Sequence, residues 1–361
     1  MAGSSFDIIT ACESPGGPPP GLSMLGGMWW SRRHPPKDFQ VSFARKTVLV
    51  TGANTGLGFE AAVKYVALGA EKLILAVRSA AKGEDAKNRI LERTRRSSGD
   101  VVIAILTVDL ADFASVQGFV RNLHQETPYL DVALLNAGLA NPKFEQSSAG
   151  WEMAVQVNVL STALMAVLLL PLLRATAAAR IKPAHLTFVN SHGHDMVQKD
   201  WYEYAGGSLL KACNDKGKWD AARSYSMVKL MGMAVMQAVA RGVTKSSTSL
   251  LSPQHPDIIV NAVCPGLCKT DLGRNFGTMS QISGFFFQGV FARTAEEGSR
   301  SLVSATALGP ESHGRLWHHD ILSPVGDIAK DEDFMKQTWA EILDAVSQGK
   351  PILQQALDGE A

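Results

Sequence analysis

Residues 46–70, KTVLVTGANTGLGFEAAVKYVALGA, constrain the fold more than any other part of the chain. They begin with a short β-branched apolar run, which predicts a buried parallel strand. A glycine-rich turn follows, and then an amphipathic helical pattern that ends at a glycine. A strand, a glycine turn and a helix in this order indicate the first βα turn of a dinucleotide-binding sheet.

Strand-like apolar runs alternate with helical segments along the rest of the chain. The expected strands lie at 72–77, 101–108, 131–137, 184–190 and 257–263, and helical patterns lie between them. This alternation predicts an α/β fold, a single doubly wound Rossmann-type domain with a parallel sheet of about seven strands flanked by helices. We expect this domain at 45–325, a partly ordered extension at 1–44 and a C-terminal helical segment at 326–361.

Composition limits the partners and the location. The net charge of +1 gives no electrostatic reason to bind nucleic acid. The four cysteines form neither a metal-type pair nor a disulfide framework, and residues 1–21 lack a secretory signal, so we expect a cytoplasmic protein. The apolar run at 163–173 is too short to span a bilayer and predicts a buried helix or a homodimer interface.

Residues 22–33 combine apolar side chains with Trp29, Trp30 and two arginines. Such a segment could lie in a membrane interface as a weak peripheral contact. The alternative, which we favour because the segment is short, is that it packs on the protein or forms a partly ordered tail.

Three glycines of the first turn, Gly52, Gly56 and Gly58, suit a pyrophosphate bound at the start of the helix. The choice of dinucleotide depends on the end of the second strand, where NAD sites usually carry an acidic residue. Here an apolar residue takes that position and Arg78 follows. A cation there suits a 2′-phosphate, so we expect NADP(H); the alternative is a solvated arginine that opens a helix.

Two inserted segments follow strands of the expected sheet, at 195–222 and 271–292. The first contains Trp201, Tyr202, Tyr204 and Trp219, and the second is apolar with interspersed glycines. Because ligands bind beyond the carboxyl ends of parallel strands, both segments are candidate substrate lids.

Tyr225 and Lys229 lie four residues apart, on one face of an expected helix. Alone, this spacing occurs easily by chance. With it come the glycine spacing TGxxxGxG, LNAG at 135–138, Asn158, Ser191 and CPGLCKT at 264–270, in this order. The ordered set, over residues 45–325, resembles the short-chain dehydrogenase/reductase superfamily, and within it the branch of retinol dehydrogenases and fungal natural-product reductases.

The resemblance implies a catalytic role for four residues. Tyr225 is expected to be the general acid in carbonyl reduction, and Ser191 to bind the substrate oxygen. Lys229 is expected to lower the pKa of Tyr225 and to hold the nicotinamide ribose. Asn158 is expected to hold a water that links Lys229 to solvent.

The same resemblance places the cofactor contacts. They are Gly52, Asn54, Gly56, Leu57, Gly58, Arg78, Asp109, Asn136, Ala137, Gly138, Tyr225, Lys229, Pro265, Gly266 and Thr270. Three positions depart from the usual pattern, namely Val228 where serine is usual, Leu135 where asparagine is usual, and VNS in place of paired serines before the catalytic site. None of them removes a catalytic group, and Val228 puts only a secondary packing or hydrogen-bonding role in doubt.

Two histidine-containing segments carry residue types that can bind a metal ion. SHGHD at 191–195 follows no familiar zinc spacing, and WHHD at 317–320 is better explained as the edge of the last strand. We therefore expect no metal.

The sequence favours an NADP(H)-dependent reductase of a hydrophobic small molecule, with a polyketide ketone as the first substrate class. A retinoid- or steroid-type alcohol is the second. A non-catalytic NADP-binding sensor is the alternative from another class, although such proteins often lose the tyrosine or the lysine.

Overall fold

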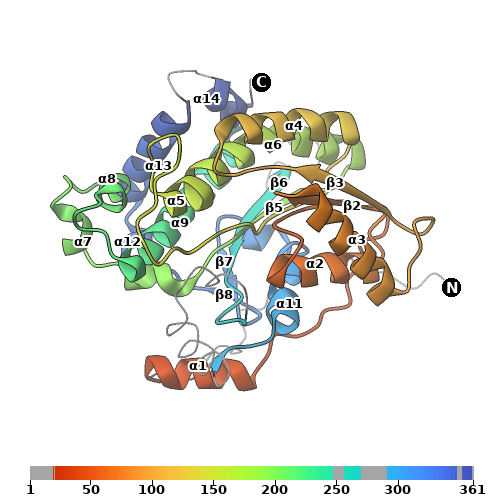
Figure 1. Ribbon diagram of the computed structural model, residues 1–361, viewed down its shortest axis with the longest axis horizontal. Coiled ribbons are helices and arrows are strands. Elements are labelled where there is room, and N and C mark those ends of the chain that lie inside the picture. Colours follow the sequence, from red (N-terminus) through yellow and green to blue (C-terminus); the bar gives the residue numbers. More distant parts are fainter. Residues whose placement is uncertain (1–18, 20, 247–255, 270–290, 348–351, 360–361) are drawn as a thin grey trace.

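The computed structural model describes residues 19, 21–246, 256–269, 291–347 and 352–359 (Figure 1). Their strands are β1 (Thr47–Thr51), β2 (Lys72–Val77), β3 (Val102–Thr107), β4 (Val132–Leu135), β5 (Ala184–Val189), β6 (Ile258–Val263), β7 (Leu316–His318) and β8 (Ile321–Ser323). They form one sheet in the order β3-β2-β1-β4-β5-β6-β7-β8. All neighbouring pairs are parallel except β7 and β8. The α/β prediction is confirmed, with eight strands in place of about seven.

The extra strand, β8, returns antiparallel to β7 through a turn at His319 and Asp320. The sequence did not suggest this hairpin, because neither turn residue is a glycine or an asparagine.

Helices pack on both faces of the sheet. They are α1 (Met24–Arg33), α2 (Gly56–Ala67), α3 (Ala80–Thr94), α4 (Phe113–Glu126), α5 (Met153–Val155), α6 (Ser161–Arg180), α7 (Asp200–Glu203), α8 (Leu209–Asn214), α9 (Ala221–Ser246), α11 (Ala295–Ala305), α12 (Asp327–Lys330), α13 (Glu332–Ser347) and α14 (Ile352–Asp358), with short turns η1 (Gln156–Leu160), η2 (His192–Met196) and η4 (Pro310–Ser312). One core cluster joins the sheet to α4, α6 and α9, and a second joins it to α2, α3 and α11. Figure 1 shows α4 and α6 on the side of the sheet opposite α2 and α11.

The helix that contains the apolar run 163–173 extends well beyond it, and a π-helical turn, η1, lies between its parts α5 and α6. The combined stretch Met153–Arg180 is long and apolar enough to cross a membrane, but 78% of its most apolar window is buried inside the protein. Its apolar side chains are therefore explained by the core, as the buried-helix alternative expected. Formation of a homodimer stays a prediction.

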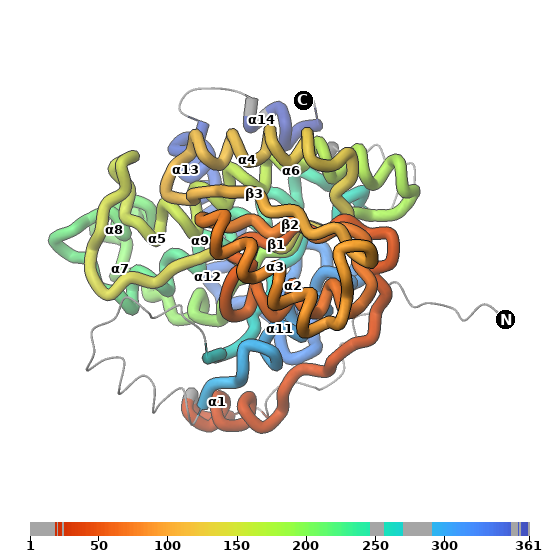
Figure 2. The backbone as a smooth tube through the Cα atoms, turned by 45° about the vertical axis from the view of Figure 1, so that its right-hand side comes forward, coloured from red at the N-terminus to blue at the C-terminus, as the bar shows by residue number. Residues whose placement is uncertain are grey.

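The N-terminal extension contains a helix, α1, which lies beside the segment leading into α11 (Figure 2). Arg32 forms an ion pair with Glu297 of α11 at 3.7 Å, so residues 22–33 pack on the protein. The outer face of α1 nevertheless exposes Leu25 and Trp29, which are 50% and 43% accessible. Contact of this face with a membrane stays a prediction.

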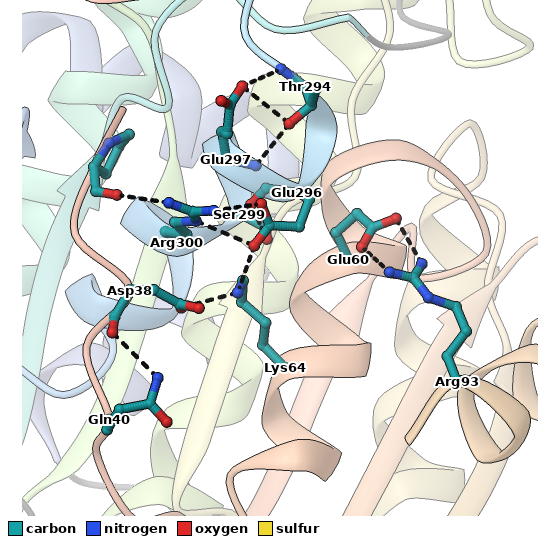
Figure 3. A network of polar contacts seen from close by, with 11 residues as sticks. Asp38, Gln40, Glu60, Lys64, Arg93, Thr294, Glu296, Glu297, Ser299 and Arg300 are labelled. Atoms are coloured by element: carbon teal, nitrogen blue, oxygen red, sulfur yellow. Dashed lines mark hydrogen bonds and ion pairs between the residues drawn. The ribbon is translucent and has the colours of Figure 1, made fainter. Parts of the chain in front are cut away.

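A polar network fixes the segment that follows α1 (Figure 3). Lys64 of α2 bonds both Asp38, at 2.9 Å, and Glu296 of α11, at 2.8 Å. Arg300 also bonds Glu296, at 2.8 Å, and donates to the carbonyl of Pro36 at 3.4 Å. The segment before β1 is thus joined to two helices of the central domain.

Candidate active site

A cavity of about 1190 Å³ opens at the carboxyl ends of the parallel strands. The chain runs from β1 outward to β3 and then returns to β4 on the other side of β1, so the cavity lies at a topological switch point. All four predicted catalytic residues and every predicted cofactor residue among the described ones line it: Gly52, Asn54, Gly56, Leu57, Gly58, Arg78, Asp109, Asn136, Ala137, Gly138, Asn158, Ser191, Tyr225, Lys229, Pro265 and Gly266. Thr270 lies outside the described residues.

The glycine turn between β1 and α2 has the geometry of a phosphate cradle. Gly52 and Gly56 have φ of +66° and +55°, a region that favours glycine. A Cβ at Gly58 would collide with the carbonyl oxygen of Gly52 and with Asn136. Thr55, the N-cap of α2, makes no side-chain capping bond, so the first N–H groups of the helix stay open to an anion.

Two cations line the cavity just beyond β2. Arg78 follows the last residue of the strand and is exposed, and Lys82 lies in the first turn of α3. Within the part of the chain that the structure describes, neither side chain forms an ion pair. Lys82 was not predicted from the sequence, although its place four residues after Arg78 is a usable signal. Together they can hold a 2′-phosphate.

The opposite wall follows β4. The hydroxyl of Thr51 accepts hydrogen bonds from the backbone N–H groups of Asn136 and Ala137, each at 2.9 Å. The Asn136 side chain donates to the Thr51 carbonyl at 2.9 Å. These bonds connect the ends of β1 and β4, so the LNAG segment is fixed beside the glycine turn.

Tyr225 and Lys229 lie on α9, one turn apart, and both face the cavity. The Lys229 ammonium lies 5.8 Å from the centre of the Tyr225 ring and donates to the carbonyl of Val189 at 3.4 Å. Burial lowers the pKa of Lys229 to about 8. Burial also raises the pKa of Tyr225, while the nearby Ser191 side chain acts in the opposite direction.

The pKa of Tyr225 therefore departs from the expectation that Lys229 lowers it. The physical reason is that desolvation of the phenol outweighs the polar contacts around it. A raised pKa keeps Tyr225 protonated at neutral pH, which suits a proton donor.

Ser191 follows β5 and caps η2, where its hydroxyl oxygen accepts from the N–H of Gly193 at 3.1 Å. Its side chain also lies near enough to Tyr225 to lower the pKa of the phenol, against the effect of burial. The two hydroxyl groups can therefore converge on one oxygen atom of a substrate.

Asn158 lies inside the π-helical turn η1, a local feature that is frequent at functional sites. Its side-chain nitrogen donates to the carbonyl of Leu139 at 2.8 Å, and its side-chain oxygen accepts from the Leu139 N–H at 2.9 Å. Asn158 thus positions the loop after β4. Its expected water-holding role stays a prediction.

Comparisons with known proteins place this geometry in a family. Residues 46–206 match the family model described as short chain dehydrogenase. The short-chain dehydrogenase/reductase ffsI of Aspergillus flavipes is 42% identical over 341 residues, which cover 94% of this chain and 96% of that protein. The chain belongs to the short-chain dehydrogenase/reductase family. It is therefore an NAD(P)-dependent oxidoreductase, as the resemblance implied.

Other relatives agree with this membership. The short-chain dehydrogenase/reductase phmF of Phaeosphaeria nodorum is 40% identical and covers 91% of this chain and 95% of its own. Among solved structures, the Pseudomonas aeruginosa RhlG/NADP active-site complex matches with a TM-score of 0.58 and 20% identity, over 81% of this chain and 99% of that one. L-Sorbose reductase from Gluconobacter frateurii, complexed with NADPH and L-sorbose, matches with a TM-score of 0.58 and 18% identity, over 78% of this chain and 97% of that one. The structural matches show the fold.

Two of the three departures from the usual family pattern, Val228 and Leu135, are explained by the structure. Val228, in place of serine, is 1% exposed and lines the cavity beside Lys229. Leu135, in place of asparagine, is 4% exposed and belongs to the core behind β4. Both are explained by apolar packing.

The first candidate lid contributes less to this cavity than expected. Of the expected segment 195–222, Met196 lines it, whereas Trp201, Tyr204 and Trp219 line a separate cavity of about 360 Å³. Tyr202 is buried and packs against Phe334 of α13, with 5.1 Å between ring centres. Of the second candidate lid, 271–292, only 291 and 292 belong to the described residues.

The histidine-containing segments lie at the cavity wall. His192 forms a hydrogen bond with Asp195 at 2.9 Å, and Nε2 of His194 lies 2.8 Å from the same carboxylate. The interpretation of WHHD as a strand edge is confirmed for β7, but it missed that His318 and His319 line the cavity. Met28 and Ser31 of α1 also line it and were missed, because no pattern before β1 pointed to the site.

Proposed function

We propose that this protein is an NADP(H)-dependent reductase that transfers a hydride to the ketone of a hydrophobic small molecule, with a polyketide intermediate as the first substrate class. The observation that carries the proposal is the convergence of Tyr225, Ser191 and Lys229 on the cavity that also contains the glycine turn. The reverse reaction, oxidation of the alcohol, would use the same residues.

The preference for NADP(H) rests on the end of β2. A buried apolar residue, Val77, takes the place where an acidic residue would bind the ribose of NAD, while Arg78 and Lys82 offer two positive charges. The open N–H groups of α2 and the glycine cradle fit the pyrophosphate. The solved complexes of RhlG with NADP and of L-sorbose reductase with NADPH support the same cofactor.

The bound cofactor would supply the hydride, and the chain would supply the proton and the orientation. Tyr225 donates its phenolic proton to the carbonyl oxygen as negative charge develops there. Ser191 donates a second hydrogen bond to the same oxygen, and the N–H of Gly193 keeps the Ser191 side chain in place.

Lys229 contributes a positive charge beside Tyr225. Its pKa of about 8 means that the ammonium form dominates at neutral pH, although burial weakens that form. As Tyr225 loses its proton in the reaction, the ammonium favours the phenolate that remains. Val189, whose carbonyl accepts from the ammonium, fixes the direction of the side chain.

Apolar walls of the cavity support a hydrophobic substrate class. Apolar side chains from several elements face the cavity, namely Met28, Leu139, Met153, Val157, Phe188 and Met196. A hydrophobic compound would remove this surface from water, which favours binding.

The test is consumption of NADPH, and separately of NADH, by the full-length protein against a panel of hydrophobic ketones and aldehydes. We expect NADPH to be oxidised faster than NADH with at least one ketone. Tight binding of NADPH without any turnover would support the non-catalytic sensor instead. Equal use of the two cofactors would contradict the role given to Arg78 and Lys82.

A further inference from the structure

The helix α1 forms part of the wall of the cavity that contains the proposed reacting centre. Gly27, Met28 and Ser31 line the same cavity as Ser191 and Tyr225. This helix precedes the residues that match the family model, 46–206. It is therefore a feature of the cavity that the family match does not account for.

A buried arginine holds α1 in this position. Arg293, 1% exposed, directly precedes the cap of α11. Its guanidinium donates to the carbonyl oxygens of Ser31, at 2.9 Å, and of His34, at 3.0 Å. It also donates to the carbonyl of Pro265, at 3.2 Å, in the turn after β6 that lines the cavity. One side chain thus joins α1 to the proposed nicotinamide side of the site.

The same arginine fixes the tautomer of His319. Its Nη2 lies 2.7 Å from Nδ1 of His319, and a guanidinium can only donate, so Nδ1 must be the acceptor. A ring that accepts at Nδ1 is neutral and carries its proton at Nε2. Burial supports this state, because it lowers the pKa of His319 far below its usual value.

The direction of the next hydrogen bond then follows. Nε2 of His319 lies 2.7 Å from the Ser31 hydroxyl oxygen and must donate to it. Arg293 Nη2 lies 3.3 Å from the same oxygen, but its two protons are directed to His34 and His319 at shorter distances. Ser31 therefore accepts from His319 and keeps its own proton to donate. Among the described residues, no acceptor for that proton is present, and Ser31 lines the cavity.

The turn that carries His319 is held in an unfavourable conformation. His319 and Asp320 have φ of +50° and +59°, which non-glycine residues adopt rarely. Asp320 accepts from the N–H of Lys37 at 2.8 Å, so the turn is also attached to the N-terminal segment. Strained residues of this kind gather at binding sites, where the surroundings fix them in place.

We propose that the Ser31 hydroxyl, positioned by Arg293 and His319, binds a second acceptor oxygen of the substrate, apart from the carbonyl that is reduced. The substrate class is then a compound with two oxygen functions, such as a diketone. This proposal rests on the proposed reductase function. A Ser31 hydroxyl whose direction is fixed by the Arg293 guanidinium and the neutral imidazole selects for a substrate that carries an acceptor atom at this place. A substrate without such an atom leaves the hydroxyl unpaired.

The experiment compares diketones with monoketones of the same carbon skeleton. Benzoylacetone, in which the two oxygens are close together, is paired with butyrophenone. Androstenedione, in which they are far apart, is paired with the two monoketones that each lack one of its carbonyls. The measured quantity is kcat/KM with NADPH, for the wild type, Ser31→Ala, Ser31→Thr and Leu25→Ala. Leu25 lies on the exposed outer face of α1 and serves as the control.

We expect the wild type to prefer at least one diketone over its monoketone by about three- to tenfold, the worth of one hydrogen bond. Ser31→Ala should remove this preference by lowering only the diketone value. Ser31→Thr, which keeps the hydroxyl, and Leu25→Ala should retain it. NADPH affinity should stay the same in all variants.

Two results would overturn the proposal while the reductase function stands. One is an equal loss for diketone and monoketone in Ser31→Ala, which would mean that Ser31 only holds α1 in place. The other is a wild type that reduces ketones without any preference for a second oxygen. If NADPH binds but no ketone in either set is reduced, the reductase function itself fails, and this proposal fails with it.

Discussion

Replacement of Lys229 by methionine should stabilise the protein while it removes activity. The pKa of Lys229 is lowered from 10.5 to about 8, so burial of its ammonium costs at most about 3 kcal/mol at neutral pH. Methionine removes that cost but also the hydrogen bond to Val189, which contributes about 1 kcal/mol. The net gain is about 2 kcal/mol. With an unfolding entropy of about 2.1 cal/mol/K per residue, this raises Tm by about 3 °C.

The gain should depend on pH in a defined direction. The pKa of Lys229 is lower in the folded protein than in the unfolded chain. The unfolded chain therefore binds more protons between about pH 8 and 10.5, and the wild type gains stability as pH rises through this window. The advantage of Lys229→Met is therefore full below about pH 8 and disappears toward pH 10.5. Differential scanning calorimetry at pH 7 and pH 10 measures it. Lys336→Met, at an exposed position of α13, is the control and should give no gain.

Two results would refute this reasoning. One is a Lys229→Met protein that is less stable than the wild type at pH 7, which would show that contacts of the ammonium outweigh its desolvation. The other is a stabilisation that does not change with pH, which would assign the effect to packing instead of charge.

Three further predictions concern the cofactor site and the protonation of Lys229. Arg78→Ala should raise the Kd for NADPH by about tenfold or more, because a charge-assisted hydrogen bond to the 2′-phosphate is lost, and leave the Kd for NADH nearly unchanged. Cofactor fluorescence titration measures both values. An equal change in the two would contradict the assignment of Arg78 to the 2′-phosphate. Gly58→Ala should abolish NADPH binding in the same titration, because a Cβ at this position collides with Gly52. Gly118→Ala in α4, where a Cβ has room, is the control and should bind NADPH normally. Normal binding by Gly58→Ala would refute the assignment of the glycine turn to the phosphates. In a pH–rate profile, kcat/KM for ketone reduction should fall as pH rises through about 8, where Lys229 loses its proton, and a rise there would be inconsistent with the role of its charge.

The parts of the site that local sequence determines could be predicted. A spacing of four residues places Tyr225 and Lys229 on one helical face wherever the helix lies. The glycine turn is equally local, because the φ angles of Gly52 and Gly56 depend on the turn between one strand and one helix. The strand–helix alternation then brings these local features to one edge of the sheet.

The remaining parts depend on contacts between distant segments. Arg293 and Ser31 are 262 residues apart, and His319 and Ser31 are 288 apart. No periodic pattern records such a contact, so the role of α1 could not be read from the chain. The pKa of Tyr225 was predicted in the wrong direction for a related reason, since burial depends on all the neighbours of the side chain and the sequence showed only Lys229.

The most direct test of the central claim compares the wild type with Tyr225→Phe in two measurements on the same preparation, the Kd for NADPH and the turnover of a ketone. Removal of the general acid should lower kcat by a factor of about 10² to 10⁴ while the Kd changes by less than about twofold. Tyr204→Phe, at a residue that lines the separate cavity, should retain full turnover. Full turnover in Tyr225→Phe would contradict the account of the site.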